Sequence, residues 1–576
     1  MADSPRSVVT TTITAKKMGY IPTMINERNR APNEYTSQQP QDKHFALGAH
    51  MSSNFSFELG GAPYTIPSPT EKPIAYVAAV VLFVSLAYAL GDHGAKLPEI
   101  NPLKPFELSN TRRILEFYQT SKELMLKGRA KFGDNPWRLM TEWGNCLVLP
   151  PDFIHELRSN PNLAFVEPAK DDSHGYIPGF EAFDGDEALP TVVTKYLTKA
   201  LTKLTKPLSE ESTLVLRHVL TDSTGISHLR DTEWHKMSPQ QDIMRIVSRL
   251  SSRVFAGEEL CRDEEWVRVS SEYTAAAFGV GYEVGQWPRW ARPIVHWFLP
   301  SCWRVRALLN ECRKTLQPHM ERRAQRKREA VAAGKTGAVF DDAVEWFEKE
   351  SSRKPDPATQ QISLSLVAIH TTTDLLTQTM IDLAEHPELF QPLRDELVRV
   401  LSKEGLKKTA LYNLKLMDSV IKESQRMKPV LLSTWRRLVM KDVTLSNGFV
   451  LRKGQKIIAT NTHMWDANYY ENPATYDGYR FLNMRGTDEE KNAHLVSTSA
   501  KHPGFGHGQH ACPGRFFAAN EVKIALAHLL LKYDWKFPDG FKPQMVPHGM
   551  VLLPDPSATL LIRRRKEELD LDSLEC

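Results

Sequence analysis

The sequence lacks the features that define several large classes of protein. Its 73 Lys and Arg residues nearly balance its 69 Asp and Glu residues, and the absence of any basic run argues against a nucleic-acid-binding protein. No Gly-x-Gly-x-x-Gly motif is present to indicate a dinucleotide-binding domain. No internal repeat is apparent.

Cysteine is scarce as well. The chain has 6 cysteines in 576 residues, and their wide scatter matches neither a disulfide framework nor the paired ligands of a structural zinc site. We therefore expect a reducing compartment for the main body of the chain. The cysteines are Cys146, Cys261, Cys302, Cys312, Cys512 and Cys576. A hydrophobic content of 41% still suffices for a large core.

One uncharged apolar segment, residues 74–90, is about as long as the shortest transmembrane helices, which need roughly 17–25 residues. A buried core helix is the alternative, but the polar flanks favour a membrane span. Basic residues are more frequent after this segment than before it, which predicts that the following body lies in the cytosol. The glycosylation sequon at Asn54 would then lie in the lumen.

Composition divides the chain into four parts. Residues 1–73, rich in Ser, Thr, Pro, Asn and Gln, are predicted to be a largely disordered lumenal segment. Residues 74–90 are the predicted anchor, residues 91–104 a proline-bounded hinge, and residues 105–576 a single mainly helical domain. Met51 is an alternative start to Met1, and the sequence does not decide between them.

The apolar periodicity of the main domain predicts mostly helices with small β-sheets. Amphipathic patterns predict helices at 362–385, 387–403, 414–427 and 516–532. Strand-like runs occur near 137–149 and 438–458.

The most informative stretch is residues 505–515, where Cys512 lies in a loop rich in Gly and Pro directly before a predicted helix. The amide groups and dipole at a helix N-terminus stabilise a thiolate. A lone cysteine in this setting suits an axial haem ligand, because the thiolate donates electron density that favours O–O cleavage.

The pattern Phe505-x-x-Gly508-x-x-x-Cys512-x-Gly514 resembles the haem-ligand signature of the cytochrome P450 family. Three further motifs upstream resemble motifs of the same family and follow one another in the same order as in that family. The resemblance implies the P450 fold over roughly residues 105–576, preceded by the single transmembrane helix, with Cys512 as the axial ligand of the iron of haem b. It also implies that the other three motif residues shape the haem-binding loop.

Glu423 and Arg426 lie three residues apart on a predicted helix. Alone, such a pair is common on surface helices and contributes little. Together with the downstream Arg480, the pair resembles the family's ExxR motif and its partner arginine. The resemblance implies a structural, buried ion network behind the haem.

Residues 366–374 resemble the family's oxygen-activation segment. The resemblance makes Thr371 the catalytic threonine, while a shift of one residue would make it Thr372. His370 stands where the family usually has an acid, and it either relays protons or merely packs. A run of threonines in a helix also has a plain structural explanation, because the hydroxyls bond carbonyls one turn earlier.

The resemblance implies cationic partners for the haem propionates. Arg437 is the better match to the family's position, with Arg436 and His510 as further candidates, and a solvated arginine pair is the alternative. The family's Trp-x-x-x-Arg pair is missing near residues 192–204. Lys195 or Lys199 could replace it.

The resemblance also implies a mostly apolar substrate pocket, which suits an apolar substrate held by few polar groups. The implied lining residues are Phe278, Val367, Val430, Leu431, Leu432, Met550 and Val551.

Residues 286–303 concentrate aromatic side chains among arginines. They predict either an aromatic corner of the core or a surface at the membrane interface. In the resembling family this region matches the loop between the F and G helices, which lies against the bilayer.

The implied reaction is monooxygenation, in which one atom of O2 enters an apolar small molecule and the other becomes water. Electrons would come from NADPH through a separate reductase, with cytochrome b5 as a further candidate partner. The chain is similar in character to fungal ent-kaurene oxidase-like terpenoid oxidases of secondary metabolism. That similarity implies a terpenoid or meroterpenoid substrate and a single-pass protein of the endoplasmic reticulum membrane.

Two alternatives remain open at this point. One is a haem-thiolate isomerase or peroxygenase that needs no reductase, and the other is a non-enzymatic haem-binding membrane protein. NADPH consumption with added reductase discriminates between the three.

Overall fold

The structure is a computed structural model that describes residues 55–59, 62–66, 73–89, 97–107, 109–184, 186–221, 233–334, 339–351 and 356–574. The chain divides into two compact units, Met1–Gly94 and Ala95–Cys576.

The first unit contains a hairpin and one helix. Strands β1 (Phe55–Leu59) and β2 (Ala62–Ile66) pair antiparallel within the segment for which the sequence predicts disorder. Asn54 and most of that segment lie outside the described residues. Helix α1 (Pro73–Ala89) coincides within one residue with the predicted anchor. In the described part of the chain, no helix combines the length and the apolar character needed to cross a membrane.

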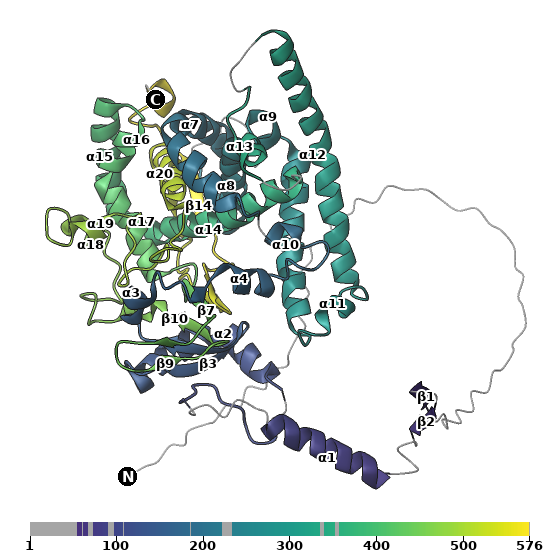
Figure 1. Ribbon diagram of the computed structural model, residues 1–576. Helices are drawn as coiled ribbons and strands as arrows, with labels where there is room; N and C mark the ends of the chain where they lie inside the picture. Colours follow the sequence, from purple (N-terminus) through teal and green to yellow (C-terminus); the bar gives the residue numbers. More distant parts are fainter. Residues whose placement is uncertain are drawn as a thin grey trace, which may run out of the picture. The chain divides into compact units, whose positions relative to one another are not determined.

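The second unit is mainly helical with small sheets, as predicted (Figure 1). Its long helices are α2 (Thr111–Phe132), α7 (Thr198–Leu220), α8 (Pro239–Phe255), α10 (Glu264–Gly285), α12 (Pro300–Ala332), α14 (Pro357–Glu385), α15 (Phe390–Glu404), α17 (Lys415–Met427) and α20 (Arg515–Lys532). Helices α17 and α20 confirm the predicted helices at 414–427 and 516–532 within one residue. The segment predicted at 387–403 begins with a short 3₁₀ turn, Pro387–Leu389, before α15.

Helix α14 lies in the middle of the second unit, against α8, α17 and α20 (Figure 1). Its start is well defined, because Pro357 occupies the first turn and the Asp356 carboxylate accepts the N–H of Ala358 at 3.2 Å. Most buried apolar side chains of α14, α8 and α20 belong to one large core cluster, while the first turns of α14 pack into a second cluster with α10 and α12. Helix α20 is buried on nearly all sides, as expected for a helix enclosed by others.

The largest sheet has five strands in the order β3 (Trp137–Thr141), β4 (Gly144–Leu149), β10 (Lys456–Ala459), β7 (Trp435–Val439) and β5 (Leu163–Ala164). Strand β10 runs parallel to β4, with Ile457 opposite Leu147, and antiparallel to β7, with Ile457 opposite Arg437. The strand-like runs in the sequence correspond to these strands.

Three smaller sheets complete the strands of the second unit. They are β11 (Tyr533–Lys536), β14 (Leu560–Arg564) and β6 (His235–Met237); β12 (Val546–His548) and β13 (Val551–Leu553); and β8 (Val443–Thr444) and β9 (Val450–Leu451).

The remaining helices are short. They are α3 (Phe153–Leu157), α4 (Val166–Asp172), α5 (Glu181–Asp184), α6 (Leu189–Thr191), α9 (Glu258–Cys261), α11 (Arg292–Val295), α13 (Ala343–Glu350), α16 (Lys408–Asn413), α18 (Arg480–Asn483) and α19 (Glu490–Ala493), with a π-helix at Val192–Leu197 and 3₁₀ turns at Asn461–Trp465 and Leu571–Ser573.

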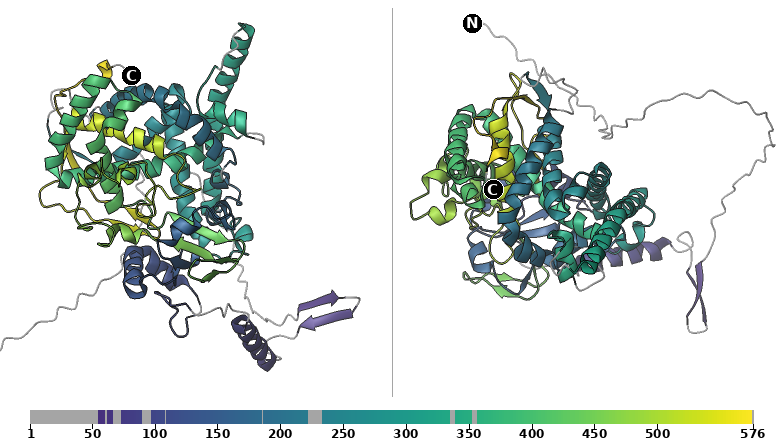
Figure 2. Two further views of the ribbon diagram at one scale, coloured as in Figure 1. Left: turned by 60° about the vertical axis from the view of Figure 1, so that its left-hand side comes forward. Right: turned by 90° about the horizontal axis from the view of Figure 1, so that it is seen from above.

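Helix α12 packs along α10 through its first half only, because its buried residues end at Leu316. Its second half extends past the neighbouring helices (Figure 2).

Candidate functional site

Cys512 lies in the loop that leads into α20. Its N–H donates to the carbonyl of Phe505 at 2.8 Å, which closes the loop, and its own carbonyl accepts from the Arg515 guanidinium at 2.8 Å. Burial raises the pKa of the Cys512 thiol, while the backbone N–H groups of Gly514 and Arg515 at the start of α20 oppose that rise. The sequence prediction of a cysteine at a helix N-terminus therefore agrees with the placement of Cys512.

Glycines allow this loop to pack closely. Gly508 has a φ of +85°, and a Cβ added there would lie 2.4 Å from the Cβ of Arg158 and 2.6 Å from its carbonyl oxygen. The loop also bonds to that carbonyl through the N–H of Gln509 at 3.3 Å. At Gly514, an added Cβ would lie 4.0 Å from the Cys512 sulfur and from Val193, which is ordinary contact. Glycine is therefore required at position 508, because the loop passes too close to Arg158 to leave room for a side chain.

The structure brings Glu423, Arg426 and Arg480 together in one ion network. The Arg426 guanidinium donates to both carboxylate oxygens of Glu423, at 2.8 and 2.7 Å, and Arg480 donates to the same carboxylate at 3.0 Å. Glu423 and Arg426 are fully buried. Arg426 also donates to the carbonyls of Met464 and Pro473, so its fork is fully used.

Strand alternation separates the two candidate arginines for an anionic cofactor group. Successive residues of β7 face opposite sides of the sheet, so Trp435 and Arg437 share one side and Arg436 points to the other. Arg436 is already paired with Asp172 at 2.8 Å. In the described part of the chain, the side chain of Arg437 has one recorded hydrogen bond, to the carbonyl of Arg436 at 2.7 Å, and no carboxylate partner.

Arg437 is buried, and burial lowers the pKa of its guanidinium to about 10. It stacks on Phe165 and Trp435, with its guanidinium carbon 5.3 and 4.8 Å from the ring centroids. His510 contacts the same Phe165 ring at 5.3 Å. Two of the predicted propionate residues are thus linked by one aromatic side chain.

The indole N–H of Trp435 is buried and has no hydrogen-bond partner among the described residues. Trp435 is not among the residues predicted from the sequence, although its place two residues before Arg437 in a strand indicates that the two share one face. A buried cation and a buried free donor on one face suit an acidic ligand group. The haem that the resemblance implies carries two such carboxylates, so these residues fit it.

Helix α14 carries the predicted oxygen-activation residues. Thr371 is exposed and shares its helix face with Val367, and its hydroxyl donates to the Val367 carbonyl at 2.9 Å. Thr372 is buried, and its hydroxyl has no partner in the described part of the chain. The exposed face favours Thr371 over Thr372, while the bond to Val367 matches the plain structural explanation.

His370 lies beside Phe278 of α10, with the rings edge to face at 5.7 Å. Burial lowers the pKa of His370, so its imidazole is neutral at neutral pH. Phe278 and Val367 each expose 51% of their surface. The structure thus groups two of the predicted pocket residues around His370.

The other predicted pocket residues form a second group. The N–H of Leu432 donates to the Met550 carbonyl at 2.8 Å, that of Leu552 donates to the Val430 carbonyl at 3.0 Å, and Leu431 bridges Val551. Leu432 and Met550 are buried, so part of this group forms core rather than accessible lining. No described contact joins the second group directly to His370 or Thr371.

Neither lysine considered as a replacement for the missing arginine is placed for that role by its contacts. Lys195 is exposed and pairs with Glu350 at 2.5 Å, and Lys199 is also exposed.

The aromatic stretch at 286–303 is a surface feature, so the interpretation as a corner of the core is wrong. Trp290 and Phe298 each expose 79% of their surface. The other exposed aromatic residues of this stretch are Trp287, Trp297 and Trp303.

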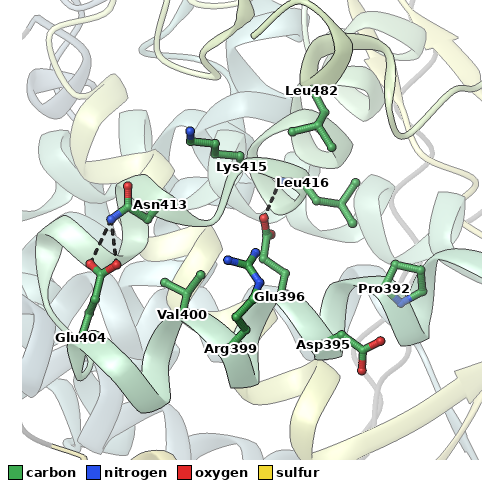
Figure 3. A pocket seen from close by; sticks show the side chains of 10 residues that line it. All are labelled: Pro392, Asp395, Glu396, Arg399, Val400, Glu404, Asn413, Lys415, Leu416 and Leu482. Carbon is green, nitrogen blue, oxygen red and sulfur yellow. Dashed lines mark hydrogen bonds between the residues drawn. The ribbon is translucent and has the colours of Figure 1, made fainter. Parts of the chain in front are cut away.

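A pocket of about 530 Å³ lies on another part of the second unit, between α15, α16, α17 and Leu482 (Figure 3). None of its lining residues is a predicted site residue. Its carboxylates have structural partners, because Glu404 accepts from the Asn413 amide at 2.9 Å and Glu396 accepts from the N–H of Leu416 at 2.8 Å. The pocket is therefore distinct from the cysteine site.

Comparison with known proteins addresses the family of the chain. A model of the family described as cytochrome P450 matches residues 159–562. The chain is 52% identical to the cytochrome P450 monooxygenase eqxH of Fusarium heterosporum, over 88% of this chain and 98% of that protein. It is 40% identical to the cytochrome P450 monooxygenase adrA of Penicillium rubens, over 86% of this chain and 97% of that protein.

A solved structure, the crystal structure of the cytochrome P450DA heme domain, has a similar fold. The TM-score is 0.61 at 16% sequence identity, and the match covers 82% of this chain and 98% of that one.

Proposed function

The chain belongs to the cytochrome P450 family of monooxygenases, and from this premise we propose that the Cys512 thiolate would hold the iron of haem b. The placement of Cys512 carries the proposal. It lies in a loop closed by its own N–H, fitted against Arg158 through Gly508 and followed directly by a helix.

The residues that would hold haem besides Cys512 are Arg437, Trp435 and His510. Arg437 and Trp435 offer donors to a propionate from one face of β7, and His510 contacts the same Phe165 ring as Arg437. When bound, a thiolate-ligated haem supplies the activation of O2 and the oxidation of the substrate.

The protein's own contribution to the reaction is proton delivery and positioning. The Thr371 hydroxyl lies on the exposed face of α14, where it can hold a proton-carrying water. His370, kept neutral by its burial, can accept a proton on one ring nitrogen and release one from the other. Both residues are on α14, whose first turn and core face are firmly packed.

The proposed electron source is NADPH through a separate reductase, with cytochrome b5 as a further partner. The proposed substrate is an apolar small molecule, and the sequence resemblance to ent-kaurene oxidase-like enzymes favours a terpenoid or meroterpenoid intermediate of fungal secondary metabolism. The apolar side chains of Phe278 and Val367 near His370 support an apolar substrate.

We further propose attachment to the endoplasmic reticulum membrane with the second unit in the cytosol. The apolar composition of α1 and the exposed Trp290 and Phe298 support membrane contact, because aromatic side chains favour the bilayer interface. Loss of a glycan-dependent mobility shift in Asn54→Gln would support the lumenal placement of the N-terminal segment. An unshifted wild-type protein in a glycosylating host would refute it.

The CO difference spectrum of the reduced protein tests the haem ligand. We expect the red-shifted Soret band of a thiolate-ligated haem in the wild type and its loss in Cys512→Ala. Haem-loaded wild-type protein without that band would overturn the proposal. NADPH consumption that depends on both reductase and substrate would distinguish a monooxygenase from a peroxygenase, an isomerase or a haem-binding protein.

A further inference from the structure

One face of α10 connects the catalytic helix to a second cluster of polar side chains. Phe278 and Tyr282 lie one turn apart on that face, about 6 Å along the helix axis. Phe278 meets His370 of α14, and the Tyr282 ring meets the Tyr118 ring of α2 edge to face at 4.8 Å. A ligand lying along this face would reach from His370 to Tyr118.

Two turns of chain meet Tyr118 at the far end of this face. His548, the last residue of β12, places its ring 5.1 Å from the Tyr118 ring, and in the turn that follows the N–H of Gly549 donates to the Tyr118 carbonyl at 3.2 Å. The turn between β3 and β4 contributes Glu142, whose Oε1 accepts the N–H of Met550 at 2.9 Å.

The approach at this point is close enough to require a glycine. Gly549 has a φ of +61°, and a Cβ added there would lie 2.8 Å from Glu142 Oε1 and 3.1 Å from Cε1 of Tyr118. Glu142 and Tyr118 therefore lie side by side against the same turn.

Several polar atoms of this cluster have no hydrogen-bond partner among the described residues. The second carboxylate oxygen of Glu142, Oε2, is shielded from solvent and has no hydrogen-bond partner among the described residues. Over the same described ranges, no hydrogen bond is recorded for the hydroxyls of Tyr118 and Tyr282 or for the ring of His548. A shielded carboxylate oxygen without a partner is unusual, because such a group normally finds a donor.

The environment of Glu142 also suits a carboxylate that accepts a hydrogen bond from a ligand. Burial raises the pKa of Glu142 to about 7, while the N–H of Met550 and the charge of Arg436 act in the opposite direction. Among the described residues no ion pair joins Arg436 to Glu142, and Arg436 is paired with Asp172 instead. A donor from a ligand would compensate the carboxylate where the protein does not.

We propose that Glu142, Tyr118, Tyr282 and His548 form a polar subsite that binds a hydrogen-bond-donating group of the substrate, an amide N–H or a hydroxyl. The subsite fixes one end of an otherwise apolar substrate while the rest lies along Phe278 toward His370. Glu142 is the specificity-determining residue, since its free oxygen accepts the donor. This inference rests on the proposed function, because it assumes that the oxidised carbon lies near Thr371 and His370.

The test uses ligands that bind haem iron at one end. A series of N-alkylimidazoles of increasing chain length would carry either an N-methylamide or a methyl ester at the far end. The two end groups have nearly the same shape and differ in a single N–H donor. The spectral shift caused by imidazole binding to haem gives the affinity of each ligand for the full-length, haem-loaded protein.

At one chain length, we expect the N-methylamide to bind about tenfold more tightly than the ester. Glu142→Gln retains an acceptor for Met550 but reduces the capacity to accept from a ligand, so the preference should fall to about twofold or less. Tyr282→Phe keeps the ring contact and should lower the preference by a smaller factor. Tyr412→Phe, on the exposed face of α16, is the matched control and should leave the preference unchanged.

Two results would overturn the inference alone: equal affinity for both end groups at every chain length, or equal weakening of both by Glu142→Gln. If haem-loaded protein shows no imidazole shift with any ligand, the proposed function fails and this inference fails with it. The two failures are therefore distinguishable.

Discussion

A methyl group added at Gly508 tests whether close approach, rather than glycine flexibility alone, fixes the cysteine loop. In Gly508→Ala the new Cβ would meet the Cβ and carbonyl oxygen of Arg158 at 2.4 and 2.6 Å. The left-handed φ of +85° costs alanine about 1–2 kcal/mol. Forcing the loop away from Arg158 adds about 1–3 kcal/mol, by analogy with overpacked sites. The expected loss is therefore about 2–5 kcal/mol.

Gly540 provides a matched control. Its φ of +77° imposes a similar backbone cost, but a Cβ there would meet nothing within 4 Å. Gly540→Ala should therefore lose only about 1–2 kcal/mol. Thermal unfolding would report both losses, and the CO difference spectrum would report whether thiolate ligation survives.

We expect Gly508→Ala to lose both stability and thiolate ligation, because the loop that carries Cys512 must move. Gly540→Ala should keep the spectrum of the wild type. If the two variants unfold alike and both keep the thiolate-type spectrum, the contact with Arg158 does not hold the loop and the reasoning is refuted.

Further predictions concern buried charges. Arg437→Leu should weaken haem retention far more than Arg436→Leu, because of these two arginines only Arg437 lacks a carboxylate partner in the described part of the chain. The rate of haem transfer to apomyoglobin measures haem retention. Equal transfer rates for the two variants would contradict the prediction. Glu423→Ala should cost about 3–5 kcal/mol in denaturant unfolding, since it leaves Arg426 buried without its counter-charge. Burial raises the pKa of Glu521 to about 8, so its stabilising contribution is full below about pH 4.5 and is lost as pH rises through about 8. The free energy of unfolding of the wild type should accordingly fall relative to Glu521→Gln over that range, and a parallel pH dependence would refute the assignment.

Local patterns were sufficient for the elements that carry the motifs. The helices at 415–427 and 515–532 follow from apolar residues at helical spacing, and proline at the start of 387–389 explains why that segment begins with a separate turn. The cysteine loop was predictable for the same reason, since its glycines and its following helix are adjacent in sequence.

The choice between Arg436 and Arg437 shows where local patterns stop. Strand alternation predicts that the two arginine side chains face opposite sides of the sheet. Only the fold shows that Asp172 lies on the side of Arg436 and Phe165 on the side of Arg437. The sequence of residues 286–303 could not decide between a surface at the membrane interface and a corner of the core. The exposure of these side chains depends on segments that are distant in the sequence.

The sequence did not predict the cluster around Glu142 as a group, although the resemblance implies pocket-lining residues in the segment 548–552. Its members come from α2, α10, the end of β12 and the turn between β3 and β4, and none of them stands in a motif. Residues that are distant in the sequence and meet only in the fold decide which substrate is recognised. Short local motifs set the chemistry of the fold, so the sequence alone identifies the reaction class more readily than the substrate.

Buried charged side chains connect helix α17, which carries Glu423 and Arg426, to the loop that contains Cys512. Helix α17 buries Lys422, Glu423 and Arg426, each with partners on other segments, and its Gln425 contacts His502 at 3.0 Å in the approach to the loop. A slip of α17 by one residue would strand these charges, and a stranded buried charge costs far more than a misplaced apolar side chain. We infer that the network fixes the register of α17 and, through Gln425, the position of the segment leading to Cys512. Glu423→Ala tests this as well, because the thiolate-type spectrum should be lost before the chain unfolds; if it persists up to the unfolding transition, the network stabilises the fold without positioning the ligand.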